Sequence, residues 1–205
     1  MLKKIIIVGF FDEAIELCEK AGYEIVGIVD KQRDDNMPYP YIGDDAYVIA
    51  NRDIYSSIPL FLVPDEPEIR EKLFFTYHDN GFTFETVVSP NAIVSKSAVI
   101  GEGCMIQDGC NISSNVKLGR CVRVNSCANI MHDSCVGDFT TIAPSSVILG
   151  RCNIGNKVYI GANATVLPDI QIRGGIVGAG AVVVKNIDDR MTVVGVPAKN
   201  LIKEP

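Results

Sequence analysis

The chain has 205 residues, of which 47% are hydrophobic, and a formal net charge of −6. This length allows one repeat domain and one small second domain, each with its own packed core. The negative charge argues against nucleic acid as a partner. Because no apolar run approaches the roughly 20 residues of a membrane-spanning helix, we expect no membrane partner either.

The beginning of the chain predicts a βαβ unit. An aliphatic run at residues 4–8 predicts a buried strand, residues 9–11 a turn, and residues 12–21 a helix with one apolar face. A second aliphatic run at residues 24–29 predicts a neighbouring parallel strand. The first run passes directly into a glycine and an acidic helix, so it is predicted to be a strand and not a signal peptide.

The turn after the first strand bears on nucleotide binding. It contains one glycine, Gly9, and no G-x-G-x-x-G sequence, so a phosphate cradle of the dinucleotide-binding type is not indicated. Asp30 stands at the end of the second predicted strand, where such folds commonly hold a ribose hydroxyl. Asp30 is therefore a candidate nucleotide contact.

The rest of the small domain follows from shorter signals. The expected elements are a polar loop at residues 31–41, a short helix at 44–51, a strand at 59–63, a helix at 65–80 and a strand at 82–88. Asp65 precedes a proline and is predicted to cap the second of these helices. The domain boundary is placed between residues 87 and 88.

The second half of the chain repeats every six residues. An aliphatic residue returns without a break at Val94, Ile100, Ile106, Ile112, Leu118, Val124, Ile130, Val136, Ile142, Ile148, Ile154, Ile160, Val166 and Ile172. A six-residue period fits neither a helix nor a long alternating strand, but it fits short strands that turn a corner every six residues. Three such strands make a coil of eighteen residues, and the sequence therefore predicts a parallel β-helix.

The repeat also explains the cysteines. The chain has seven, an odd number, and most occupy positions where a small apolar residue is required, Cys104, Cys110 and Cys152 most clearly. We interpret them as reduced core residues, which is typical of a cytoplasmic protein. After Ile172 the register breaks, and Val177 and Val183 resume it one residue early. Such a break suits either a ligand site or ordinary loop variation.

One corner of the repeat carries residues suited to proton transfer. His132 and Asp133 follow the aliphatic position Ile130, so they are predicted to lie at a corner outside the packed interior. A carboxylate can hold the neighbouring imidazole in one tautomer, which makes it a general base near neutral pH. A surface imidazole without a role is the alternative. His78, in the predicted helix beside Asp79, is expected to be solvated surface.

The whole chain resembles the left-handed β-helix acyltransferases of the sugar O-acyltransferase type, specifically the bacterial nucleotide-sugar N-acetyltransferases that resemble sialic acid O-acetyltransferase. The matching residues are the linker Ser89-Pro90-Asn91-Ala92, Asn125, His132-Asp133, Gly150 and the closing Gly195-Val196-Pro197-Ala198-Lys199. The resemblance implies two domains: an α/β domain with a Rossmann-like βαβ unit at residues 1–87, and an all-β left-handed parallel β-helix of hexapeptide repeats at residues 88–205. It also implies a homotrimer with sites shared between subunits.

The resemblance further implies an activity. It is acetyl-CoA-dependent N-acetylation of the 4-amino group of a UDP- or dTDP-linked amino-deoxy sugar, for surface polysaccharide such as lipopolysaccharide. In that reaction His132 is the general base, Asp133 orients it, and the N–H of Gly150 receives the acetyl oxygen, so no metal is needed.

Binding residues follow from the same resemblance. Gly9, Asp30 and Asn125 are expected to hold the nucleotide-linked amino sugar. The pantetheine arm of acetyl-CoA is expected to run past Gly161, Ala162, Gly178 and Ala179, with its phosphates at Lys185 or Lys199.

The sequence departs from this family in two places. Family members usually carry a Gly-rich loop with a histidine after the first strand, whereas Gly9-Phe10-Phe11-Asp12 is shorter and lacks both. Thr141 stands where many relatives have a second histidine. The way in which the first domain binds a sugar nucleotide is therefore left open.

Three other classes share the β-helix. An O-acetyltransferase would act on a sugar or small-molecule hydroxyl, and a non-enzymatic scaffold would need no chemistry. A γ-class carbonic anhydrase requires three histidines for zinc, but the chain has only His78 and His132.

Overall fold

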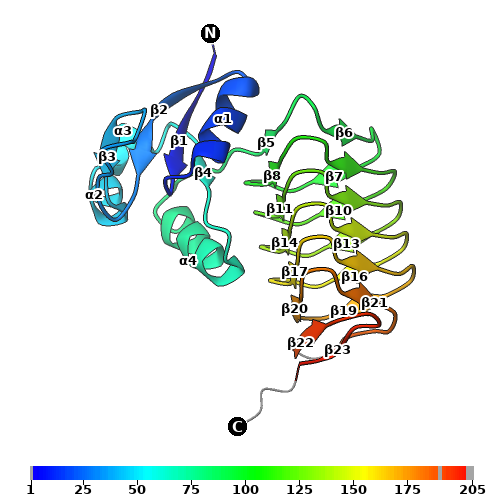
Figure 1. Ribbon diagram of the computed structural model, residues 1–205. Helices are drawn as coiled ribbons and strands as arrows, with labels where there is room; N and C mark the ends of the chain where they lie inside the picture. Colours follow the sequence, from blue (N-terminus) through cyan, green and yellow to red (C-terminus); the bar gives the residue numbers. More distant parts are fainter. Residues whose placement is uncertain (1, 189–190, 202–205) are drawn as a thin grey trace.

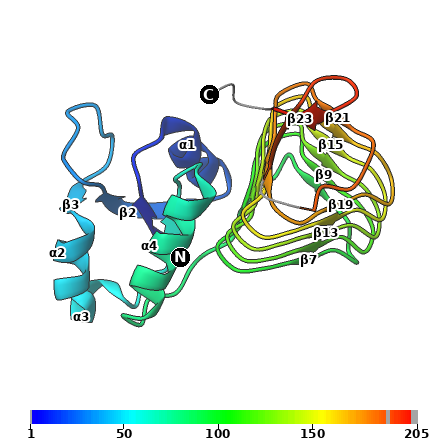
Figure 2. The same ribbon diagram turned by 90° about the horizontal axis from the view of Figure 1, so that it is seen from below.

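The computed structural model describes residues 2–188 and 191–201. It consists of an α/β domain and a β-helix that lie side by side, joined by one crossing of the chain (Figure 1). Viewed along the coil axis, the β-helix has three sides, and the α/β domain faces one of them (Figure 2). Residues 202–205, which end the predicted second domain, lie outside the described residues.

The α/β domain is built on a parallel sheet. Its strands are β1 (Lys3–Val8), β2 (Tyr23–Val29), β3 (Tyr41–Gly43) and β4 (Leu60–Leu62), in the spatial order β3-β2-β1-β4. Its helices are α1 (Asp12–Lys20), α2 (Asp45–Ala50), α3 (Arg52–Tyr55) and α4 (Pro67–His78). The predicted βαβ unit is present as β1-α1-β2.

Both faces of this sheet are buried, as the unbroken aliphatic run in β1 requires. Ile5 and Ile7 pack with the apolar residues of α1 on one face. Ile6 and Val8 pack on the other face with Phe74 of α4. Alternate residues of β1 thus form two separate cores.

Some predicted elements of this domain are wrong. The predicted strand at residues 82–88 forms only at its end, as β5 (Val87–Val88), because the chain leaves the sheet of the α/β domain before that point. Phe84 makes a single bridge to Leu60, and Val87 and Val88 pair instead with the β-helix. Two short elements were not predicted from the sequence. They are α3 and β3, and β3 begins at the last residue of the expected loop 31–41.

The predicted cap of the fourth helix is also wrong. The N-cap of α4 is Glu66, whose side chain makes no capping hydrogen bond. The Asp65 side chain instead faces the β-helix, where Tyr159 donates a hydrogen bond to it. A tertiary contact therefore replaces the local cap. The short helix at residues 44–51 is present as α2, capped by Asp44, which accepts from Tyr47 N at 2.8 Å.

The β-helix is made of three parallel sheets, with one strand of each sheet in every coil. Sheet 1 contains β5 (Val87–Val88), β8 (Met105–Ile106), β11 (Arg123–Val124), β14 (Thr141–Ile142), β17 (Tyr159–Ile160), β20 (Gly175–Val177), β22 (Met191–Val194) and the antiparallel β23 (Lys199–Asn200). Sheet 2 contains β6 (Ile93–Val94), β9 (Asn111–Ile112), β12 (Asn129–Ile130), β15 (Val147–Ile148), β18 (Thr165–Val166) and β21 (Val182–Val183). Sheet 3 contains β7 (Val99–Ile100), β10 (Lys117–Leu118), β13 (Cys135–Val136), β16 (Asn153–Ile154) and β19 (Gln171–Ile172).

The repeat positions form the core, as predicted. Ile112, Ile130 and Ile148 pair in register on successive coils and are fully buried. The predicted register break is confirmed, since Val177 pairs with Ile160 and ends a shorter coil. Aliphatic residues stacked in this way make each coil a template for the next.

The boundary and the surface complete the fold. β5 straddles the predicted boundary between residues 87 and 88, and we propose that the two domains meet within this strand.

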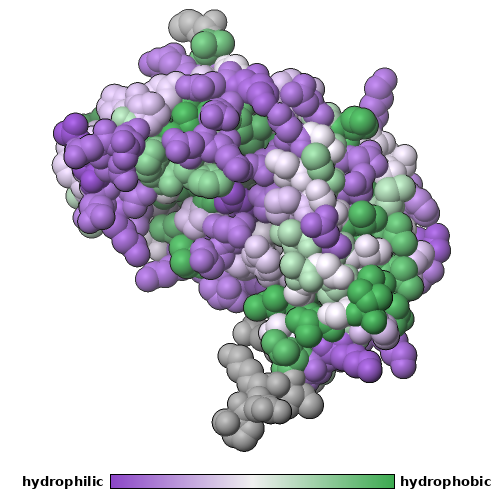
Figure 3. Space-filling view, in the orientation of Figure 1, coloured by the Kyte–Doolittle hydropathy of each residue, from purple (hydrophilic) through white to green (hydrophobic). Residues whose placement is uncertain are grey.

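No helix within residues 2–188 and 191–201 is long and apolar enough to cross a membrane. Hydrophobic side chains gather over the carboxyl-terminal end of the β-helix (Figure 3), and Ile176, Val184 and Val196 are exposed there.

Candidate functional site

His132 and Asp133 form a hydrogen-bonded pair at the corner between sheets 2 and 3. The His132 Nδ1 atom lies 2.8 Å from Asp133 Oδ2, and both side chains are nearly half exposed, at 46% and 47%. Asp133 adopts a left-handed conformation with φ of 60°, which Asp tolerates better than most residues. Asn115, one coil away, donates from Nδ2 to Asp133 Oδ1 at 2.9 Å. The bonds from Asn115 and His132 lower the pKa of Asp133 and keep it ionised.

This pairing determines which histidine nitrogen is available. An ionised carboxylate only accepts hydrogen bonds, so His132 Nδ1 carries the hydrogen and Nε2 is left as the basic nitrogen. The ring lies against Gly150 on the next coil, where an added Cβ would come within 2.7 Å of Nε2. Residue 150 must therefore be glycine for the imidazole to occupy this position.

Gly150 also presents a backbone donor beside the ring. Its carbonyl accepts from Asp169 N at 3.1 Å, whereas its N–H donates to no backbone carbonyl within the described residues. A fixed backbone N–H without an internal acceptor is the kind of donor that can stabilise an oxyanion. The structure thus places three predicted residues, His132, Asp133 and Gly150, at one corner.

A large cavity lies between the two domains. Its volume is about 1040 Å³, and its lining includes the carboxyl ends of β1, β2 and β4. β1 and β4 flank the point where the strand order reverses, because β2 and β3 lie on one side of β1 and β4 on the other. Ligands of open parallel sheets bind at such a switch point. The predicted residues Gly9, Asp30 and Asn125 all line this cavity.

Gly9 and Asp30 shape the cavity wall together. Gly9 has φ of +98°, a conformation that favours glycine. The Asp30 carboxylate accepts from Phe10 N and from Lys31 N, each at 2.7 Å. Asp30 therefore holds the loop that follows β1 through Oδ2 and the backbone after its own strand, β2, through Oδ1.

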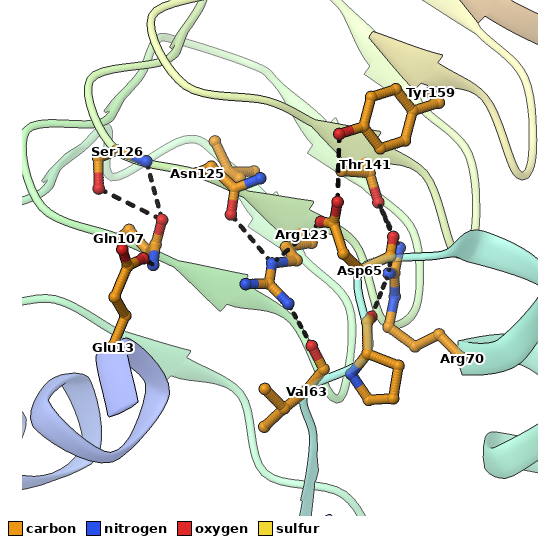
Figure 4. Close-up of polar contacts among 12 residues, drawn as sticks. Glu13, Val63, Asp65, Arg70, Gln107, Arg123, Asn125, Ser126, Thr141 and Tyr159 are labelled. Atoms are coloured by element: carbon orange, nitrogen blue, oxygen red, sulfur yellow. Dashed lines mark hydrogen bonds and ion pairs between the residues drawn. The ribbon is translucent and has the colours of Figure 1, made fainter. Parts of the chain in front are cut away.

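The opposite wall contains functional candidates that sequence reasoning missed (Figure 4). Arg123, on β11, is only 5% exposed and donates from Nε to Asn125 Oδ1 at 2.9 Å. Its Nη1 donates to Val63 O, and its Nε lies 3.4 Å from Asp65 Oδ1. Burial lowers the pKa of Arg123, and the nearby Asp65 charge opposes that shift. Tyr159 donates to the other oxygen of Asp65 at 3.1 Å.

A second buried arginine joins the domains. Arg70, on α4, is 2% exposed and donates to the carbonyls of Pro64, Asp65, Cys121 and Phe139 and to Thr141 Oγ1, at 2.6 to 3.0 Å. Burial lowers the pKa of Arg70 to about 10. Thr141 is fully buried in this contact and donates to Asp65 O at 2.9 Å. It therefore has a structural role in this chain.

The predicted coenzyme residues lie mostly at the corner between sheets 1 and 2. Gly161 follows β17 and Gly178 follows β20, so both stand below Asn125 in the same column of the coil. A Cβ on Gly161 would lie 2.6 Å from Ala179 N. The absence of a side chain therefore lets two successive coils, with Ala162 and Ala179, approach closely.

The two predicted phosphate-binding lysines are exposed but stand on different sheets. Lys185 follows β21 and reaches the same corner as His132 and Gly150. Lys199 lies on β23, which pairs with β22 at the end of sheet 1.

A single chain does not bring the two groups of predicted residues together. His132 is not among the residues that line the cavity. The cavity faces sheet 1 and its corner with sheet 2, whereas the pair of His132 and Asp133 stands at the corner beyond sheet 2. The catalytic candidates and the substrate-binding candidates therefore occupy adjacent corners of the β-helix.

Residues 88–193, just over half of the chain, match the family model described as the GMPPB C-terminal domain. The putative lipopolysaccharide biosynthesis O-acetyl transferase WbbJ of Escherichia coli strain K12 is 40% identical over 67 residues, covering 32% of this chain and 32% of that protein. The matches to curated relatives span only 20% and 32% of those proteins' lengths.

Two solved structures are similar over nearly the whole chain. PerB from Caulobacter crescentus has a TM-score of 0.90 at 30% identity, covering 98% of each chain. The acetyltransferase domain of PglB from Neisseria gonorrhoeae FA1090 has a TM-score of 0.88 at 27% identity, covering 98% of this chain and 100% of that one. The chain therefore belongs to the hexapeptide-repeat acyltransferase family, and its repeats belong to the GMPPB C-terminal domain family.

Proposed function

We propose that this protein is an acetyl-CoA-dependent N-acetyltransferase that acts on the 4-amino group of a nucleotide-linked amino-deoxy sugar. The observation that carries the proposal is the pair of His132 and Asp133, with the imidazole packed against Gly150, whose N–H donates to no backbone carbonyl within the described residues. A left-handed coil and an amino-terminal domain of the Rossmann-like class are part of the same proposal.

The comparisons support the substrate class. PerB was solved with CoA and GDP-perosamine, and the PglB domain with acetyl coenzyme A. We therefore include GDP with UDP and dTDP as candidate nucleotides. The name of the E. coli relative supports a role in lipopolysaccharide or other surface polysaccharide synthesis.

The residues suit one sequence of bond changes. The sugar amine attacks the thioester carbonyl carbon as His132 Nε2 removes a proton from the nitrogen, so a C–N bond forms. The N–H of Gly150 donates to the oxyanion of the tetrahedral intermediate. Collapse of that intermediate breaks the C–S bond, and the departing CoA thiolate takes the proton from the His132 imidazolium, which releases the thiol of CoA and restores the neutral base. Asp133 keeps the imidazole in the required tautomer and stabilises the imidazolium.

The positions of the two site halves support a homotrimer. The cavity and the pair of His132 and Asp133 stand at adjacent corners of one chain, so a second copy is needed to bring a bound sugar to the base. Exposed Ile176, Val184 and Val196 give such an assembly apolar surface to bury. All seven cysteines are free thiols, which agrees with the cytoplasmic location that we include in the proposal.

Thiol release from acetyl-CoA tests the function directly. UDP-, dTDP- and GDP-linked 4-amino sugars are supplied together with the matching 4-hydroxy sugars, and light scattering of the same sample determines its mass. We expect release with one amino sugar and a species of three chains. Activity in a stable monomer would contradict the shared site.

The same assay addresses a second candidate, O-acetylation. The O-acetyl transferase name of the E. coli relative favours it, and a pair such as His132 and Asp133 also suits deprotonation of a hydroxyl. Release with the 4-hydroxy sugars alone would establish the O-acetyltransferase. No release with any sugar would favour a non-enzymatic scaffold.

A further inference from the structure

The cavity contains an arginine that the proposed chemistry does not use. Arg123 projects from β11 toward the α/β domain and is 95% buried, since its exposed fraction is 5%. The Arg123 Cζ atom lies 5.2 Å from the centroid of the Phe11 ring, which also lines the cavity. Asn125 accepts a hydrogen bond from the guanidinium, and Asp65 lies beside it (Figure 4).

One end of this guanidinium remains available. Nε is used by Asn125 and Nη1 by Val63 O, whereas Nη2 donates to no acceptor within the described residues. Among the described residues, Asp65 Oδ1 is the one buried side-chain atom that is inaccessible and has no hydrogen bond. Because Arg123 Nη2 also has no hydrogen bond but is not such an atom, Nη2 is accessible, and a ligand in the cavity can reach it. A nearly buried cation with a free donor directed into a cavity favours an anionic ligand.

The start of α1 adds donors to the same cavity. Phe10, Phe11 and Glu13 line it, and the N-cap of α1 is Phe11, which makes no side-chain capping bond. Helix N–H groups at an uncapped amino terminus attract anions. The loop has no glycine-rich cradle of its own, so an anion bound there needs another cation.

The carboxylates around the cavity are mostly occupied. Asp30 accepts from two backbone N–H groups, Asp45 accepts from Tyr77 at 2.6 Å, and Glu13 accepts from Gln107 at 3.1 Å. Asp65 accepts from Tyr159 through Oδ2, and its Oδ1, which has no hydrogen bond within the described part of the chain, is inaccessible, so Arg123 Nη2 is a free group of this wall that a ligand can reach.

We propose that Arg123 binds the diphosphate of the sugar nucleotide, with Asn125 as a positioning residue and the Asp65 carboxylate as an anion that competes with the diphosphate for the guanidinium. The proposal rests on the function proposed above, because it takes the ligand to be a nucleoside diphosphate sugar. Arg123 lies between the Asp30 side of the cavity and the Asn125 corner, so the nucleoside occupies the α/β domain and the sugar reaches toward the corner. A planar fork matches phosphate oxygens better than an ammonium does.

Calorimetric titration of the full-length assembled protein tests this inference. The probes are GDP, UDP and dTDP with guanosine, uridine and thymidine. We expect wild type to bind one diphosphate at least about tenfold more tightly than its nucleoside. Charge-assisted hydrogen bonds contribute about 1.5–3 kcal/mol, so Arg123→Gln should weaken diphosphate binding about 10–100-fold and leave nucleoside binding unchanged. Lys72→Gln removes an exposed cation from the same cavity and serves as the matched control, with less than about a threefold effect.

Asp65→Asn provides an independent test, because it should change the diphosphate affinity in the opposite direction to Arg123→Gln. This test can be made even if Arg123→Gln does not fold. The amide keeps the shape of Asp65 and its bond to Tyr159 but removes the charge 3.4 Å from Arg123. Diphosphate binding should become tighter, about three- to tenfold, with nucleoside binding unchanged. Unchanged or weaker diphosphate binding would overturn the role of Arg123.

The remaining outcomes separate the two proposals. If Arg123→Gln keeps the wild-type ratio of diphosphate to nucleoside affinity, or if Lys72→Gln loses as much, the inference fails while the acetyltransferase stands. If wild type binds no nucleoside diphosphate, this inference and the proposed substrate class both fail. Thiol release with a sugar that carries no nucleotide would then identify the activity that remains.

Discussion

The His132 corner and the interdomain cavity differ in how the chain builds them. The corner is local: His132 and Asp133 are consecutive, and Asn115 and Gly150 stand one coil away on either side. The cavity wall is nonlocal, since Tyr159 and Asp65 are 94 residues apart in sequence. The corner is also half exposed, whereas Arg123 and Arg70 are almost completely buried. Substitutions should therefore affect chemistry at the corner, ligand binding at Arg123 and stability at Arg70, which joins the two domains outside the cavity lining.

The largest effect is expected from His132→Asn. Its side chain lies outside the core, so the variant should fold like wild type. Loss of a general base typically costs 10²–10⁴-fold, roughly 3–5 kcal/mol, so kcat should fall by about that factor while coenzyme binding is unchanged. His78→Asn is the matched control, because His78 is also exposed and lies 3.3 Å from the adjacent Asp79. A His132→Asn enzyme with more than about a tenth of wild-type kcat would disprove the assigned base.

Arg70→Met is expected to lower the stability of the protein, whereas His132→Asn lowers kcat and leaves stability unchanged. Five N–H donors would disappear, and buried carbonyls such as those of Cys121 and Phe139 would lose their partners at about 1–3 kcal/mol each. We expect the free energy of unfolding to fall by about 3 kcal/mol or more, measured by urea denaturation. Arg33→Met, at an exposed position, controls for loss of charge and should change it by less than about 0.5 kcal/mol.

This contrast explains what the sequence could predict. The β-helix was predictable because the signal recurs in every coil, and Ile112, Ile130 and Ile148 pair as that period requires. The pair of His132 and Asp133 was predictable as a contact because adjacent residues at a corner need no distant partner. The roles of both residues, and those of the other site residues, stay predictions.

The rest depended on contacts between distant segments. Arg123 stands beside Val124 on a two-residue strand, where an outward-facing charge normally indicates solvent, and only the α/β domain buries it. Asp65 has the local signature of a helix cap, but Arg123 and Tyr159 compete for its carboxylate. Arg123 and Asn125 are two residues apart, so their side chains point to the same side of the coil. This spacing was the only local sign in the sequence that polar residues line the cavity wall.

A smaller loss of activity is expected from Gly150→Ala, which tests whether the corner geometry matters as much as its residues. The new methyl group would lie 2.7 Å from His132 Nε2 and Cε1, so the ring must move. Misplacing a catalytic group by about 1 Å can cost about 10²-fold, and we expect kcat to fall by about that factor without loss of stability. Ser114→Ala, on the adjacent coil at the same corner, should keep near-wild-type kcat. If Gly150→Ala is equally active, the close contact between Gly150 and the imidazole does not position the ring for the reaction.

The smallest effect is expected from Asp133→Asn, which separates orientation of the ring from proton transfer. Since Asp133 does not take the substrate proton, kcat should fall by less than about 10²-fold. The hydrogen bonds from Asn115 and His132 lower the pKa of Asp133 in the folded protein, so any stabilisation is present above the unfolded pKa of about 3.9 and is lost as the pH falls through the folded value. The difference in Tm between wild type and Asp133→Asn, measured from about pH 5 to about pH 2, should therefore shrink as the pH falls. A difference that instead grows on acidification would mean that the carboxylate is not held ionised by its neighbours, and the orienting role assigned to it would have to be abandoned.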